Sequence, residues 1–114
     1  MLVIREQQLE VLSRAMRRHF EDLAVAHLQS ALPDRCEAMG AAAVRASVMK
    51  AMQAARMYGL VEEYDILRYL NLMYVLGLEF DRDSRFPWAA DILSDSQLQG
   101  RTKMDLLMEQ ARSV

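Results

Sequence analysis

The stretch from Glu6 to Leu32 contains neither glycine nor proline, and Pro33 follows it directly. Its apolar side chains recur at spacings of three and four residues, which places them on one face of a helix. At about 1.5 Å per residue this helix is about 40 Å long, whereas a domain of roughly 100 residues has a radius of gyration near 13 Å. The sequence therefore predicts a long first helix that kinks or projects, and a projecting helix needs a partner. The apolar face consists of Leu9, Leu12, Met16, Phe20 and Leu23.

Charged residues on the same helix are spaced to pair with one another. Residues four positions apart are neighbours on a helix surface, and opposite charges there stabilise the helix by a few tenths of a kcal/mol, about 0.2–0.5 per pair. We expect three such ion pairs on the solvent sides of the helix. They are Glu10–Arg14, Arg17–Glu21 and Arg18–Asp22.

The rest of the chain is divided into further helical segments. The expected segments are a short turn from Asp34 to Met39, helices over 41–58, 62–76 and 102–112, and a short helix over 88–94 that Pro87 starts. The glycines at 40, 59, 77 and 100 are spaced like helix terminators, and Gly59 occupies a left-handed C-terminal cap. No segment has the alternation of a strand. The sequence predicts an all-α fold, a single helical domain over 1–114 with five or six helices bundled with the long first one.

The helix over 62–76 is apolar on nearly every side. Between residues 64 and 76, the only charged or amide side chains are Asp65, Arg68 and Asn71. A helix of this kind is either central in its domain or covered by another chain.

Charge is unevenly distributed along the chain. The net charge is −2, which argues against binding nucleic acid through its phosphates. Residues 1–60 carry eight basic and six acidic groups, residues 61–95 carry three basic and eight acidic groups, and residues 96–114 carry one more basic than acidic group. The net charge of −5 in the second block is either an acidic surface that attracts a basic partner or a solvated face.

Residue patterns that support catalysis or metal binding are missing. Cys36 is the only cysteine, so no intramolecular disulfide forms, and we expect a buried or half-buried structural thiol. His19 and His27 are eight residues apart, not the four that bring two imidazoles to one metal ion, and we expect His19 in the core or at its boundary. No nucleophile elbow or glycine-rich phosphate loop occurs. We therefore expect no enzyme, no cofactor and no metal.

No segment of the sequence resembles a signal peptide or a membrane span. The first five residues are too short for a signal-peptide core, and the longest apolar run, 72–78, is far below the roughly 20 residues of a span. We expect a cytoplasmic protein that binds neither membrane nor nucleic acid.

The remaining features point to protein binding. Nine methionines provide adaptable apolar surface, or they fill an irregular helical core. Aromatic and acidic residues alternate in one non-periodic loop, which suits an interface hot spot or a loop that its tryptophan holds to the core. The candidate partner-binding residues are Phe80, Asp81, Asp83, Phe86 and Trp88.

Several of these features together resemble a family of proteins. The sequence elements are Phe20, His27-Leu28 before Pro33, Gly40 with Val44-Arg45, Tyr58-Gly59, Tyr69 with Leu72-Met73, Gly77, Phe80-Asp81-x-Asp83, and Pro87-Trp88-Ala89 with Ile92-Leu93. The chain resembles small helical accessory proteins encoded beside type VI secretion effector and PAAR genes in Gram-negative bacteria. Ser84 stands where that loop has proline, which puts the geometry of the loop in doubt.

The resemblance implies a co-chaperone or adaptor that binds a secretion effector or the effector's chaperone, and it brings no catalytic residues. Such a protein uses the projecting first helix or the acidic-aromatic region 78–92. Two alternatives stay open. One is an immunity-like inhibitor of a toxin, and the other is a homodimeric regulatory protein without a foreign partner.

Overall fold

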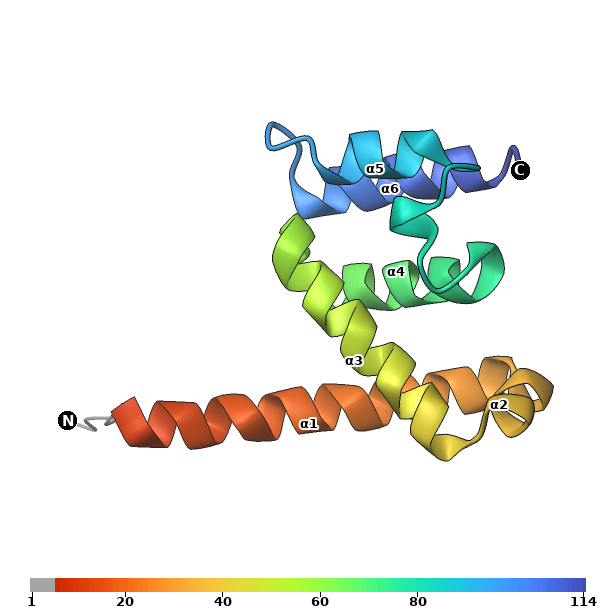
Figure 1. Cartoon of the computed structure of the whole chain (residues 1–114). Coiled ribbons are helices and arrows are strands. Elements are labelled where there is room, and N and C mark those ends of the chain that lie inside the picture. Colours follow the sequence, from red (N-terminus) through yellow and green to blue (C-terminus); the bar gives the residue numbers. More distant parts are fainter. Residues whose placement is uncertain (1–5) are drawn as a thin grey trace. The chain divides into compact units, whose positions relative to one another are not determined.

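The computed structural model describes the backbone of residues 6–114, and the side chains of residues 10, 11 and 13–114. Six α-helices and one 3₁₀ helix follow one another, and the described part of the chain contains no strand (Figure 1). The predicted all-α fold with a long N-terminal helix is thereby confirmed. The elements are α1 (Glu6–Ala31), α2 (Pro33–Met39), α3 (Ala41–Tyr58), α4 (Glu63–Leu76), η1 (Phe80–Arg82), α5 (Pro87–Leu93) and α6 (Gly100–Ala111).

Helix boundaries agree with the expected ones to within two residues. α2 begins at Pro33, in the first turn where a missing N–H is harmless, and no side chain caps it. α3 ends as expected at Gly59, whose φ is +76°. The Leu60 N–H then donates to the Ala55 carbonyl at 2.8 Å, which completes a Schellman-type cap.

Gly100 corrects the interpretation of all four glycines as helix terminators. It begins α6 instead of ending a helix. A Cβ at this position would lie 2.6 Å from the Gly59 carbonyl oxygen, so the first turn of α6 approaches the end of α3 too closely for any side chain. A glycine can be required for a close contact or for a positive φ, and spacing along the sequence does not distinguish these two requirements.

The described chain forms two compact units, one up to Ala46 and the other from Ser47 to Val114. The single-domain interpretation stays a prediction. The first unit contains α1, α2 and the beginning of α3. The second contains the rest of α3 with α4, η1, α5 and α6.

In the first unit, the buried face of α1 is not the expected one. Phe20, Ala24 and Leu28, spaced four apart, are buried, whereas Met16 is 63% and Leu23 is 52% exposed. The row that starts at Phe20 faces inward, so the neighbouring strip of the helix is left to solvent. Leu9 and Leu12, also expected on the apolar face, lie outside the described side chains. His19 is exposed, which corrects its expected core position, and Cys36 is buried as expected.

In the second unit, α4 is the central helix, as one of the two explanations for its apolar sequence predicted. Half of its 14 residues are buried, and it packs against both α6 and η1. α5 also packs against α6 (Figure 1). The largest fully buried side chains of this unit are Tyr69, Leu70, Met73, Tyr74, Phe80, Leu93, Met104 and Leu107. None of the described helices is both long enough and apolar enough to cross a membrane.

Candidate functional site

The aromatic residues predicted to bind a partner lie mainly in the core of the second unit. Phe80 has 0% exposed surface, and its ring centroid lies 5.0 Å from that of Tyr69. Phe86 is 8% exposed and packs at 5.7 Å against Trp88, which is half-buried. Trp88 is thus the member of this trio with appreciable surface for a partner.

The two acidic members of the predicted site bind groups of their own chain. Asp81 accepts a hydrogen bond of 2.6 Å from the Tyr58 hydroxyl. Asp83 accepts one of 2.7 Å from Arg85 and one of 2.9 Å from the Arg85 backbone N–H. These local partners hold the loop, and the role of the five residues in binding a partner stays a prediction.

Burial and the contact with Asp81 act together on Tyr58. Burial disfavours the phenolate, and the hydrogen bond and negative charge of Asp81 disfavour it further. Together they raise the pKa of Tyr58 to about 12.

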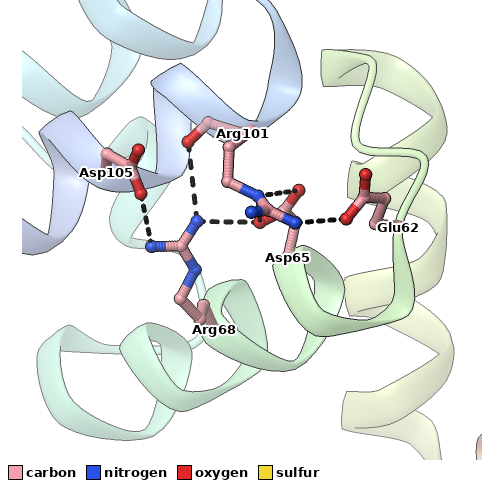
Figure 2. A network of polar contacts seen from close by, with 5 residues as sticks. All are labelled: Glu62, Asp65, Arg68, Arg101 and Asp105. Carbon is pink, nitrogen blue, oxygen red and sulfur yellow. Dashed lines mark hydrogen bonds and ion pairs between the residues drawn. The ribbon is translucent and has the colours of Figure 1, made fainter.

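A polar network joins the first turns of α4 and α6 (Figure 2). Its centre is Asp65, which is 2% exposed and lies 2.7 Å from Arg68 and 3.3 Å from Arg101. Arg68 also binds Asp105 at 2.8 Å, and Arg101 binds Glu62. Opposite charges face each other throughout, which is the arrangement of a structural ion-pair network.

The network borders a shallow hollow of about 330 Å³. The ring of Tyr64 is exposed, and both guanidinium groups lie over it. The centroid of this ring is 4.9 Å from the Cζ of Arg68 and 5.6 Å from the Cζ of Arg101. Because two arginines already occupy the Asp65 carboxylate, the hollow offers no free buried acid or base for catalysis. It is lined by Gly59, Val61, Glu62, Asp65, Gln99, Gly100 and Arg101.

Lys103 is the buried cation that the sequence did not reveal. It is 6% exposed, and its Nζ donates hydrogen bonds of 2.8 Å to the carbonyls of Tyr58 and Leu93. Tyr58 is the last residue of α3 and Leu93 the last of α5. The ammonium group therefore binds the negative ends of two helix dipoles. The sequence around Lys103 has the pattern of an ordinary amphipathic helix, which does not indicate this role.

The most exposed apolar surface of the first unit lies on α1. Every described side chain from Glu10 to His19 is exposed, on all sides of the helix. Two exposed apolar residues, Met16 and Leu23, lie on one face of α1. In a helix that buries one face against its own domain, such a run of residues would alternate between buried and exposed.

The expected ion pairs on α1 form only in part. Arg14 lies 3.9 Å from Glu10 as predicted. Glu21 and Asp22 instead pair with Arg45 of α3, at 3.3 and 3.0 Å. Among the described residues, no carboxylate forms an ion pair with Arg17 or Arg18, and Arg17 donates to Ser13 at 3.0 Å. Within the described part of the chain, these two neighbouring cations thus have no acidic partner.

Comparisons with known proteins found no matching family model, no similar curated protein and no similar solved structure. Within the described residues, no group of three or more His, Cys, Asp or Glu side chains could hold a metal ion.

Proposed function

We propose that this protein is a non-catalytic helical adaptor that binds another protein through α1. The observation that carries the proposal is the exposure of every described side chain from Glu10 to His19. Packing of an apolar face supplies most helix stability in proteins. A partner that covers Met16 and Leu23 would provide that packing.

The partner we propose is a bacterial type VI secretion effector or the chaperone of that effector, bound in the cytoplasm. This finer assignment rests on the resemblance of the Tyr58-Gly59 and Phe80-Asp81-x-Asp83 elements to the accessory family. The adaptor would cover apolar effector surface until the effector is handed over.

Two other functions remain candidates. An immunity-like inhibitor would protect cells from its toxin, which a growth-rescue assay measures. A homodimeric regulator would be a stable dimer by light scattering and would bind no foreign protein.

Co-expression with each protein encoded beside this chain, followed by co-purification, tests the proposal. We expect one of those proteins to co-purify with the wild-type chain and to be lost with Met16→Asp/Leu23→Asp. Val75→Asp is the matched control, because Val75 is 75% exposed on α4 in the other unit. Circular dichroism checks that all variants stay helical.

Two outcomes would contradict the proposal. In the first, the chain purifies alone with every neighbouring gene product. In the second, the Met16→Asp/Leu23→Asp variant retains the partner as well as the Val75→Asp control does.

A further inference from the structure

The exposed half of α1 has two different sides. Met16 and Leu23 are seven residues apart, so they lie within about 20° of each other around the helix axis. At about 100° per residue, Arg17 lies about 100° from Met16 in one direction and Arg18 about 160° in the other. Arg17 thus lies beside the apolar strip, and Arg18 lies almost opposite to it.

The positive charge of this segment depends on Arg45. Glu21 and Asp22, four residues after Arg17 and Arg18, are in position to neutralise them. Their contacts with Arg45, at 3.3 and 3.0 Å, direct both carboxylates to α3 instead. Arg45 thereby leaves two arginines available to an acidic partner.

From this arrangement we infer that α1 binds in a groove of its partner protein that is apolar at the floor and acidic at the rim. The inference rests on the proposed function and specifies the chemistry of the partner. Met16 and Leu23 would contact the floor, and Arg17 and Arg18, which lie farther around the helix, would reach acidic groups at the rim. A groove of this kind covers several sides of the helix, in agreement with the exposure of residues 10–19 on all sides.

Other occupants fit these observations less well. One further α1 helix from a second copy would cover the Met16–Leu23 strip alone and leave Arg17 and Arg18 facing solvent. An anionic membrane would attract the arginines, but a flat surface in contact with the Met16–Leu23 strip would not reach Arg18, which lies almost opposite to that strip. The groove with an acidic rim accounts for both the apolar and the cationic side.

Calcium-loaded calmodulin is the probe for the test, because its methionine-rich grooves bind basic amphipathic helices. The whole chain is titrated into it in about 50 mM salt, where charge pairs are weakly screened. We expect the wild-type chain to bind and Met16→Asp/Leu23→Asp to lose binding. Arg17→Gln/Arg18→Gln should weaken binding about tenfold, which corresponds to about 1.4 kcal/mol. Arg56→Gln/Arg112→Gln removes two exposed charges from the other unit and should bind like wild type.

Three results would overturn the inference. They are no binding to calmodulin, equal binding by wild type and Arg17→Gln/Arg18→Gln, and a wild-type dimer in sedimentation that Met16→Asp/Leu23→Asp dissociates. Binding to phosphatidylserine vesicles that requires Arg17 and Arg18 would likewise assign this surface to membranes. Each of these results rejects the acidic groove. The proposed function stays intact if Met16→Asp/Leu23→Asp still loses the co-purified partner that the wild-type chain retains.

Discussion

The guanidinium of Arg45 lies 3.0 Å from the carboxylate of Asp22, which follows Arg18 by four residues on α1. The same guanidinium lies 3.3 Å from Glu21, four residues after Arg17. The two acids raise the pKa of Arg45 above its usual value, mainly through the hydrogen bond with Asp22. A residue of α3 thus pairs with two neighbouring acidic residues of α1.

Arg45→Gln is expected to weaken binding to calcium-loaded calmodulin while leaving Met16 and Leu23 in place. Without Arg45, Glu21 and Asp22 become free to pair with Arg17 and Arg18, which lowers the positive charge of the exposed segment. Calorimetric titration measures the effect. Arg56→Gln, an exposed position near the other end of α3, is the control, and equal affinity of the two variants would refute the role of Arg45.

Lys103→Met is expected to lower the free energy of unfolding by about 2 kcal/mol, because it removes two charged hydrogen bonds and leaves the Tyr58 and Leu93 carbonyls without their donor. Urea denaturation measures this loss. Lys50→Met removes an exposed lysine paired with Glu79 and should change stability much less. Equal effects of the two substitutions would show that Lys103 does not hold the ends of α3 and α5.

Gly100→Ala is expected to destabilise the protein by about 1–3 kcal/mol, the usual cost of overpacking. The added Cβ would lie 2.6 Å from the Gly59 carbonyl oxygen, and backbone cannot move aside as a flexible side chain does. Thermal unfolding compares this variant with Thr102→Ala, an exposed position in the same turn. If Gly100→Ala stabilises α6, as alanine does in a free helix, the close approach is wrong.

Stability should fall in alkaline solution as Tyr58 ionises. Its pKa is raised from 10.0 to about 12, first by burial and then by Asp81, so its contribution is fully present below pH 10 and is lost as the pH rises towards 12. Burial also raises the pKa of Tyr69, which adds to the same effect. Urea midpoints from pH 9 to about 12 measure the fall.

Tyr58→Phe should make this alkaline loss of stability smaller, whereas Tyr64→Phe, at an exposed position, should leave it unchanged. An identical pH profile for all three proteins would show that folding does not raise the pKa of Tyr58.

Helix type and extent could be predicted because the sequence is locally consistent. The apolar spacing of α3 and its glycine cap agree with each other, so its limits are predicted to the residue. Glycine signals are ambiguous, however. Gly59 is needed for its φ of +76° and Gly100 for a close contact, and both are single glycines at helix ends.

The candidate site was harder to predict, because it depends on tertiary packing. An aromatic residue beside acids suits both a surface hot spot and an anchored loop, and only the fold shows that Phe80 is fully buried. Periodicity likewise placed Phe20 and Met16 on one face, although a small rotation of α1 buries the first and exposes the second. Long-range pairs such as Arg45 with Asp22 leave no local signal.

Backbone hydrogen exchange of α1, in the free chain and in complex with the co-purified partner, tests the central claim most directly. We predict that the amides of residues 10–19 exchange rapidly in the free chain, because no described side chain there is buried, and become strongly protected in the complex. The opposite result would contradict the account: residues 10–19 exchange equally fast in both states, and new protection appears only around Phe80–Leu93.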